Sequence, residues 1–346
     1  LSVNNPVEAP KGGGNPNVYR PRPAESKSED GIYRAQIKVI YNPFDLRRSV
    51  LEQQSYAMQD ATGWFSVVSS LTNNDTSCPV FKAWKTCHYS KDVVLQNQAK
   101  KKEEGGNQLF DKRYARYVTI QVLEDNNHPE LNGKYMFWKM PKAVWEVINA
   151  KQSPTNPAKA AIPVMDFLFG RAIDLEVKPG PGKPGDERYS RETSYTAELT
   201  DDVVSCVNPD MSPLLNATQQ AVLDQYVEDM KKVWKEKDPA TRTSLKATVD
   251  ASDNTKELRS FYRTVVDKIK TFCPDLIAEL GYNDWSDDVK NRVQKWIDIV
   301  LTGNNPAAMA PTAAASVDTG NTVSPAAEPV SAPDPMASND DDDLPF

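Results

Sequence analysis

The chain has 346 residues, of which 39% are hydrophobic, 9% aromatic and 26% charged, so it can bury a core and is not disordered throughout. The formal net charge is −7, and residues 304–346, with seven acids and no base, carry all of it. Residues 31–195 instead hold 23 bases and 18 acids. The low overall charge therefore hides a basic region, which excludes a uniformly acidic surface.

The composition also indicates where the protein is located and which kinds of catalysis it is unsuited to. No apolar run approaches the roughly 18 residues of a membrane span, and the N-terminus has no apolar signal-peptide stretch. Four scattered cysteines are typical of a reducing compartment, and two histidines argue against histidine-based catalysis. We expect a cytoplasmic protein without a membrane partner.

The first two thirds of the chain show the two-residue period of β-strands. Residues 1–30, rich in Pro, Gly and Asn, predict a flexible arm. Alternating apolar and polar residues then predict strands, and Asn132-Gly133 predicts a tight turn between two of them. The expected strands are residues 32–41, 64–68, 114–123, 135–140 and 172–177, with a short helix at 142–150.

After about Ser212 the apolar period changes to 3.6, which predicts helices at 218–235, 256–272 and 287–301. Ala, Pro, Ser and Thr dominate beyond Gly303, a composition typical of a disordered linker. The expected fold is α+β, with a small β-barrel first. The predicted domains are the arm (1–30), the barrel core (31–211), the helical region (212–303) and a disordered linker with an acidic tip (304–346).

Aromatic and basic residues alternate along the predicted core. Single-stranded nucleic acid needs this pairing, because bases stack on aromatic faces while Lys and Arg follow the phosphates. Any single Tyr in such a pair is more often a core residue, but the repeated pairs and the basic segment together favour a nucleic-acid groove. The candidate contacts are Tyr33, Arg34, Trp64, Trp84, Lys85, Lys112, Arg113, Tyr114, Arg116, Tyr117, Trp138, Lys139, Tyr189 and Arg191.

A metal site and an enzyme are both disfavoured. Cys78, Cys87 and His88 supply three candidate zinc ligands, whereas a structural site wants four, and two of these are adjacent in sequence. The chain has no phosphate-loop, dinucleotide-binding or zinc-protease motif. We expect no catalytic residue, no metal and no cofactor.

The last seven residues form a distinctive tip. Asp340, Asp341, Asp342 and Asp343 precede Leu344, Pro345 and Phe346, so an acidic run ends in an apolar tripeptide and a carboxylate. A solubility tail explains the acids but not the apolar terminus. The tip predicts a docking peptide, whose phenyl ring enters an apolar pocket while its charges meet basic residues of a partner.

This tip resembles the C-terminal peptide of bacterial single-stranded DNA-binding proteins. The body, from about Ile37 to Tyr195, resembles the helix-destabilising single-stranded DNA-binding proteins of T-even phages. The likeness is clearest from Tyr117 to Asp125 and across Asn132-Gly133-Lys134, and then from Trp145 to Ala150. It implies an oligonucleotide-binding barrel that coats single-stranded DNA in phage-type replication, recombination and repair, in the bacterial cytoplasm.

The resemblance also implies roles for particular residues. It implies that Trp138 and Lys139 form an aromatic–basic DNA contact and that Lys112, Arg113 and Arg116 lie in a basic stretch before a long strand. Tyr189 falls near a contacting tyrosine. The family's zinc ligands are not all matched, since Phe81 and Val68 stand where cysteines are expected. The implied partners are single-stranded DNA, replication and recombination proteins at the tip, and other copies of the chain on DNA.

Two other functions fit the same sequence features. An oligonucleotide-binding groove also suits an RNA-binding or annealing factor. A DNA-processing enzyme with unrecognised catalytic carboxylates is the other alternative.

Overall fold

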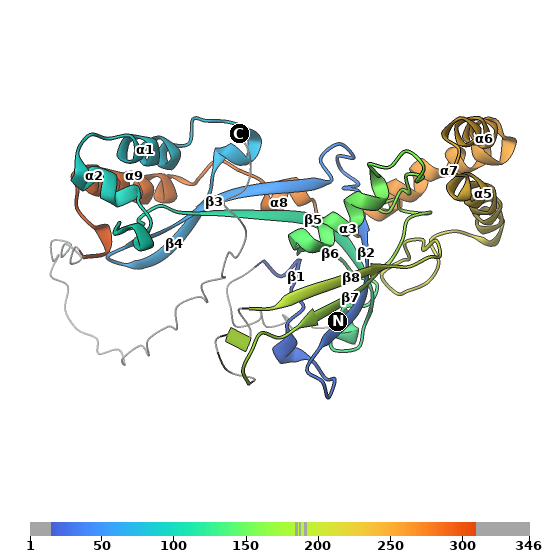
Figure 1. Cartoon of the computed structure of the whole chain (residues 1–346), viewed down its shortest axis with the longest axis horizontal. Helices are drawn as coiled ribbons and strands as arrows, with labels where there is room; N and C mark the ends of the chain where they lie inside the picture. The colour runs from blue at the N-terminus through green and yellow to red at the C-terminus, as the bar shows by residue number, and fades with distance from the viewer. Residues whose placement is uncertain (1–14, 184–185, 187, 190–191, 309–346) are drawn as a thin grey trace, which may run out of the picture. The chain divides into compact units, whose positions relative to one another are not determined.

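The computed structural model describes residues 15–308, apart from residues 184–185, 187 and 190–191. This part of the chain is α+β (Figure 1) and divides into two compact units. The first unit contains residues 15–51 and 116–279, and the second contains residues 52–115 and 280–308. This division crosses the domain boundaries expected from the sequence, because the chain leaves the first unit and returns to it.

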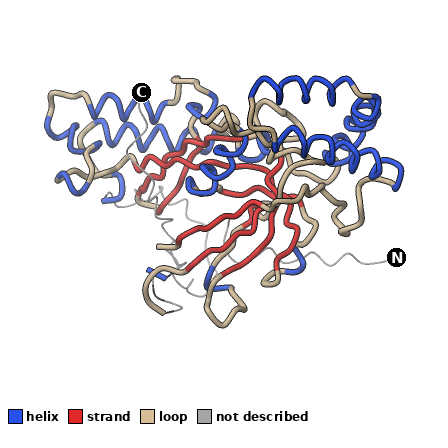
Figure 2. The backbone as a smooth tube through the Cα atoms, turned by 45° about the vertical axis from the view of Figure 1, so that its right-hand side comes forward, coloured by secondary structure: helices blue, strands red, loops and turns tan. Residues whose placement is uncertain are grey.

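The described strands form one mixed, open sheet, drawn in red in Figure 2. The strand order is β1-β6-β5-β2-β7-β8, and β3 pairs with β4 and with β5. β1 pairs with β6 in parallel, whereas β2, β5, β6, β7 and β8 pair antiparallel. The strands are β1 (Val18–Tyr19), β2 (Tyr33–Ile40), β3 (Val50–Asp60), β4 (Gly63–Val68), β5 (Asp111–Asp125), β6 (Tyr135–Lys139), β7 (Ile173–Lys178) and β8 (Ser194–Leu199).

The expected closed barrel is not found among the described strands, since β1 and β8 each have a single neighbour. The reason is that alternation specifies which side chains face the core, whereas closure depends on which strands become neighbours and on their stagger. The five predicted strands themselves are confirmed as β2, β4, β5, β6 and β7.

The helices follow their capping signals. Asn216 and Gln219 form a reciprocal capping box before α5, and the Ser252 hydroxyl accepts from the Thr255 N–H at the start of α7. The predicted helices at 142–150, 218–235, 256–272 and 287–301 are confirmed as α3, α5, α7 and α9. The helices are α1 (Pro79–His88), α2 (Val93–Ala99), α3 (Lys142–Gln152), α5 (Ala217–Lys235), α6 (Pro239–Ala251), α7 (Asp253–Lys270), α8 (Leu276–Leu280) and α9 (Asp287–Leu301). Within the described residues, none is both long and apolar enough to cross a membrane.

The sheet of the first unit is buried on both faces. On β2, Ile37 and Val39 belong to one apolar cluster together with Trp138 of β6. Ile40 belongs to a second cluster, which includes Leu223 of α5 and residues of α7. Because neighbouring residues of a strand point to opposite faces, Lys38 lies on the same face as Ile40, and its side chain is fully buried.

The buried Lys38 lies against a tight loop. Its ammonium group has no hydrogen-bond partner among the described residues, and burial lowers its pKa. A methyl group at Gly170 would collide with the Lys38 Nζ and with the carbonyl oxygens of Val164 and Asp166. Glycine at this position therefore allows the loop to approach the lysine closely.

Asp166 fixes this loop to α7. Its Oδ1 accepts hydrogen bonds from the backbone N–H groups of Leu168 and Phe169, at 2.9 and 3.1 Å. Its Oδ2 accepts a hydrogen bond from the Tyr262 hydroxyl at 2.8 Å. Burial raises the pKa of Asp166, against the effect of these hydrogen bonds. The carboxyl group thus connects the loop to the helical layer.

Residues 15–30, expected to belong to a flexible arm, contain β1 and a short 3-10 helix (Pro23–Glu25). The hydroxyls of Tyr19 and Tyr33 both donate to Oδ2 of the buried Asp125, at 2.8 and 2.5 Å. The Lys27 N–H donates to Asn127 Oδ1 at 2.9 Å. Side-chain hydrogen bonds to one end of β5 therefore attach this segment to the sheet.

The second unit packs the β3–β4 hairpin against α1, α2 and α9 (Figure 1). Tyr56 and Met58 of β3 meet Trp296 of α9 in its core. Arg292 of α9 also holds the hairpin end, because its guanidinium contacts both Asp60 carboxylate oxygens at 2.7 and 3.0 Å. The same guanidinium lies 4.0 Å from the Phe65 ring centroid.

The Asp60–Arg292 pair predicts a pH-dependent stability. Burial alone would raise the pKa of Asp60, but hydrogen bonds from Arg292 and Thr62 lower it to about 2. A carboxyl whose pKa is lower in the folded chain stabilises it above the unfolded pKa, and this contribution is lost as pH falls toward the folded pKa. Asp60→Asn should lower the free energy of unfolding by about 1–3 kcal/mol at pH 6.

Denaturant unfolding of both proteins between pH 6 and pH 2 measures this difference. The difference should shrink as the pH falls from about 4 to 2. Glu103→Gln, at an exposed position of the same unit, is the control and should change stability little. A difference that stays constant down to pH 2 would contradict the assigned ion pair.

Candidate nucleic-acid interface

Helix α1 has two distinct faces. Val80, Ala83 and Cys87 are buried in the core of the second unit. Phe81 and Trp84 lie beside this apolar face and are only partly buried. The helical period therefore directs one stripe of α1 into the core and leaves an aromatic stripe at its border.

The aromatic stripe forms a continuous ladder. The rings of Phe81 and Trp84 stack with centroids 5.9 Å apart and an interplanar angle of 10°. His88 stacks on Trp84 at 4.8 Å and 16°, and Tyr89 meets the His88 ring edge-on at 4.7 Å. We call Phe81, Trp84, His88 and Tyr89 the aromatic ladder.

Two lysines lie over the ladder rings. The Lys85 Nζ is 4.6 Å from the Phe81 ring centroid. The Lys112 Nζ, on β5, is 5.7 Å from the Trp84 centroid and 4.8 Å from that of Tyr114. We call the ladder together with Lys85, Lys112 and Tyr114 the ladder surface.

The ladder surface is open to solvent. Tyr89 is 73% exposed and Tyr114 is 44% exposed, although both carry large rings. Exposed rings beside ammonium groups offer stacking faces and positive charge within a few ångströms of one another. A flexible single strand, whose bases are unpaired and whose phosphates are charged, has the matching chemistry.

The structure does not bring Trp64 and Arg113 to this surface. Lys112 and Tyr114 alternate with Arg113 along β5, so the Arg113 side chain points to the opposite face of the strand. It pairs there with Asp111 at 2.7 Å. On β4, Trp64 alternates with Phe65, which packs against the core, and Trp64 remains 53% exposed.

Three aromatic residues among the sequence candidates lie in the first unit's interior. Tyr33 is 0% exposed and Trp138 is 1% exposed, so neither can offer a ring face to a base in this structure. Tyr189 is also buried, with its hydroxyl close to Gly31. The aromatic–basic pattern did not separate them from the ladder because it records neighbours in sequence, not which face of a strand is covered.

The basic candidates of the first unit have other neighbours. Arg34 is ion-paired with Asp30 at 2.8 Å and with Glu176 at 2.9 Å. The Arg116 guanidinium lies 5.4 Å from the Trp145 ring centroid.

The other candidates are two half-buried residues of the sheet, Arg191 and the tip. Tyr117 and Lys139 are half-buried and face each other across β5 and β6, and burial raises the pKa of Tyr117. Arg191 and the tip residues 340–346 lie outside the described residues.

Phe81, His88 and Tyr89 were missed as contacts. Their signal was available, because positions 81, 84, 85 and 88 repeat at three- and four-residue steps and so share one side of a helix. Adjacent aromatic and basic residues indicate only Trp84 and Lys85 in this segment, because Phe81 and His88 are their neighbours on the helix and not in the sequence.

The cysteines of this segment face inward. Cys78 and Cys87 are both buried in the core of the second unit, whereas His88 is exposed. Burial raises the pKa of the Cys87 thiol to about 11, so it remains protonated at neutral pH. In the described part of the chain, no three His, Cys, Asp or Glu side chains gather as metal ligands.

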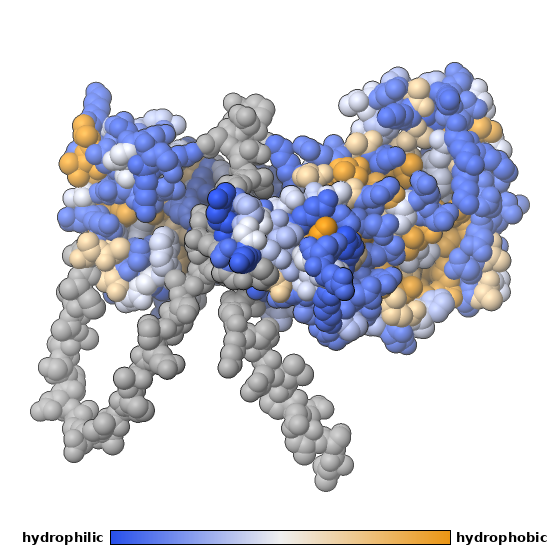
Figure 3. All heavy atoms as spheres, turned by 60° about the horizontal axis from the view of Figure 1, so that its bottom comes forward, coloured by the Kyte–Doolittle hydropathy of each residue, from blue (hydrophilic) through white to orange (hydrophobic). Residues whose placement is uncertain are grey.

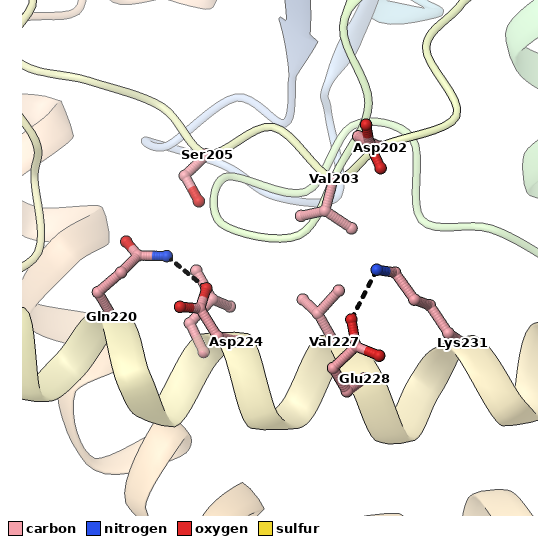
Figure 4. Close-up of a pocket in the computed structure, with 9 residues that line it drawn as sticks. Asp202, Val203, Ser205, Gln220, Asp224, Val227, Glu228 and Lys231 are labelled. Carbon is pink, nitrogen blue, oxygen red and sulfur yellow. Dashed lines mark hydrogen bonds and ion pairs between the residues drawn. The ribbon is translucent and has the colours of Figure 1, made fainter.

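The first unit contains a hollow of about 270 Å³ (Figure 4). It lies between α5 and the loop around Asp202. Four of its polar groups interact in pairs, since Lys231 pairs with Glu228 at 2.7 Å and Gln220 donates to Asp224 at 2.8 Å. Because these groups are already paired, the hollow is a weaker candidate for a ligand site than the ladder surface.

One face of the described chain is mostly polar. On the face drawn in Figure 3, hydrophilic residues cover most of the area and apolar residues form separate patches. Large exposed apolar side chains, including Val93 and Val94 of α2, are few in the described chain. Exposed aromatic rings therefore stand out from their surroundings.

No known family model matches the chain, and no curated protein matches it.

Core and surface tryptophans should respond differently to truncation. Trp138→Ala should lower the free energy of unfolding by about 3–5 kcal/mol, because it leaves a large cavity in the first unit. Trp84→Ala should cost about 2 kcal/mol or less, because its ring is only partly buried. Urea unfolding of the two variants measures both values. Equal losses would show that Trp84 is a core residue as well.

Proposed function

We propose that this chain is a non-enzymatic single-stranded DNA-binding protein that coats DNA without sequence specificity. It acts in phage-type replication, recombination and repair and recruits partner proteins through Asp340–Phe346. The observation that carries the proposal is the ladder surface, in which Lys85 and Lys112 lie over stacked, solvent-accessible rings. Such a surface accepts any base, because every base has a stacking face.

Lys85 and Lys112 supply the positive charge of this surface. Each lies over an aromatic face, and no ion pair with a carboxylate joins either of them within the described chain. Their charges are thus available to phosphates, and binding releases counterions from the strand. This supports a binding module more than a catalytic site, which would need convergent acids and bases.

We also propose that the sheet of the first unit is an opened variant of the oligonucleotide-binding fold. That fold is a partly open barrel of five strands, and β2, β5, β6, β7 and β8 form five successive antiparallel neighbours here. The register shift between Gln36 and Ile37 adds local twist, as bulges do in barrels. An experimental structure of the DNA complex would test this assignment.

The main test is a titration of labelled oligothymidylate, a duplex of equal length and an RNA of equal length, with and without Mg²⁺. Tight binding of the single-stranded DNA, with no cleavage, is the expected result. Preference for RNA would favour the RNA-binding alternative, and Mg²⁺-dependent cleavage would favour an enzyme.

The ladder surface should supply most of the affinity of the second unit for a strand. Trp84→Ala should weaken binding by about 1–3 kcal/mol per base lost from the stack. Lys112→Gln should reduce the slope of log affinity against log salt by about 0.7, the value for one phosphate of a single strand. Fluorescence anisotropy at several salt concentrations measures both. Lys256→Gln on α7, where the lysine pairs with Asp253, is the matched control and should bind as wild type.

The tip should act separately from DNA binding. Phe346→Ala removes one apolar ring and no charge, so DNA affinity should be unchanged while recruitment of replication and recombination proteins is lost. Co-precipitation from cells producing the full chain measures recruitment. A variant that still recruits every partner would show that the tip is not a docking peptide.

A further inference from the structure

We propose that the outer edge of β4 is a self-association surface, through which two copies of the chain pair as antiparallel strands about a two-fold axis. This inference goes beyond the proposed function, because the pairing does not involve nucleic acid. Strand β4 pairs with β3 alone, so within the described chain its other side has no strand neighbour. An unpaired edge presents backbone donors and acceptors to a further strand.

The hydrogen-bond pattern of the β3–β4 hairpin identifies the outward groups. The Ser69 N–H donates to the Gln54 carbonyl at 2.8 Å, in the same antiparallel register as the rest of the hairpin. In such a pair, hydrogen-bonded residues alternate with residues whose backbone groups point away from the partner strand. The backbone groups of Trp64 and Ser66 therefore point away from β3, and no hydrogen bond reaches them within the described residues.

One end of this edge is already closed. The Trp285 indole N–H donates to the Val68 carbonyl at 2.9 Å. This bond agrees with the alternation, because Val68 lies two residues beyond Ser66 and its carbonyl also points outward. It leaves Trp64 to Ser66 as the part of the edge that can accept another strand.

The β4 edge lacks the features that protect the other edges of the sheet. Strand β1 has only two residues, and β8 carries Glu198. Gly63–Val68 contains no charged residue and no proline. Short length, charges and prolines are the usual protection of strand edges. At the hairpin end the charges of Asp60 and Arg292 compensate each other, so they do not repel a second copy.

The side chains select one register for the pair. Trp64 and Ser66 are exposed on one face of β4, whereas Phe65 packs against the core. When Trp64 lies opposite Ser66 of the second copy, the outward N–H and carbonyl groups of both residues find partners. Each large indole then lies beside a small side chain. A register with Ser66 opposite itself would need the Val68 carbonyl, which Trp285 occupies.

A second copy suits this edge better than a charged ligand. No lysine or arginine lies over the Trp64 ring in the described part of the chain, so a phosphate has no cation here. A pairing of this length buries less than the roughly 1,600 Å² of a stable interface, so we expect a weak dimer. Each copy uses its edge once, so the pair is closed and does not extend into a fibre.

Cysteine cross-linking of the full chain tests the pairing and its register. Chains with Trp64→Cys are mixed with chains with Ser66→Cys and treated with oxidised glutathione, which is reduced as the disulfide forms. The four native cysteines are buried, so the introduced thiols react. Directly opposite Cα atoms lie about 5.5 Å apart, within the range of a disulfide. The mixture should therefore give a cross-linked dimer.

The register control is each variant oxidised alone. Trp64→Cys paired with itself, or Ser66→Cys paired with itself, places the two thiols on a diagonal of about 7–8 Å between Cα atoms, which is too far for a disulfide. Each should therefore cross-link much less than the mixture. Ser260→Cys, at an exposed position of α7, should not cross-link with either variant.

Sedimentation velocity over about a hundredfold range of concentration measures the dimer without cross-linking. Ser66→Lys places a charge in the pairing, and Ser66→Pro removes an N–H that β3 does not use. Each should weaken dimerisation at least about tenfold, since the two-fold axis doubles every lost contact. Ser260→Lys is the matched control and should dimerise as wild type. Thermal melting checks that the variants are folded, and Ser66→Lys decides if Ser66→Pro is not.

A wild-type chain that stays monomeric and gives no cross-link in the mixture would overturn this inference. Undiminished dimerisation of Ser66→Lys, or equal cross-linking of each variant alone, would also overturn it, because association would then use another surface or register. Binding of oligothymidylate is measured separately, at concentrations where the chain is monomeric. Absence of that binding would reject the proposed function and leave the β4 pairing intact.

Discussion

The two-residue period of β5 decides which of the predicted contact residues can meet a ligand. In the second unit, this strand places Lys112 and Tyr114 beside α1 and directs Arg113 to the opposite face. In the first unit, the same period buries Val118, Ile120 and Val122 against the core that contains Trp138. A one-residue shift in register would exchange these sets, so core packing and the ladder surface depend on the same alternation.

Burial also sets the chemistry of the interior. Lys38 and Asp166 are both buried. Burial lowers the pKa of Lys38 and raises the pKa of Asp166, so it favours the neutral form of each side chain. The Asp166 carboxyl accepts hydrogen bonds from two backbone N–H groups and from Tyr262, so the loop and α7 share one polar contact inside an apolar cluster. Such contacts favour one arrangement of the helices over others.

Much of the fold could be predicted from local patterns, but its connectivity could not. The strands with clear alternation and the amphipathic helices were found, because their side chains repeat with the period of the element. β3 was missed, since Glu52, Gln53 and Gln54 interrupt any apolar alternation. Barrel closure was expected because single-sequence patterns do not report strand neighbours. The division into two units was missed because it joins segments far apart in the chain.

The candidate site was predicted in part for the same reason. Trp84, Lys85, Lys112 and Tyr114 were identified from adjacent aromatic and basic residues, and the structure brings them together. The same signal selected Trp138, which the core encloses. His88 needed a helical projection of α1, where residues four apart become neighbours. Aromatic and basic residues that are adjacent in sequence thus show which residue types a segment contains. Residues spaced by the period of the helix or strand show which side chains share a surface.

The two-residue strand β1 has a further consequence for the edge of the sheet. It pairs with Phe137 and Trp138 of β6, and the Phe137 N–H donates to the Asn17 carbonyl at 2.7 Å. Without β1, β6 would present unpaired backbone groups beside very apolar side chains, which is a template for intermolecular pairing. The Tyr19–Asp125 hydrogen bond therefore helps to hold β1 in place over the edge of β6. Shortened chains that begin after Tyr19 would lack β1 and expose the edge of β6, which favours aggregation. Shortened chains that begin before Asn15 would keep β1 as the edge strand.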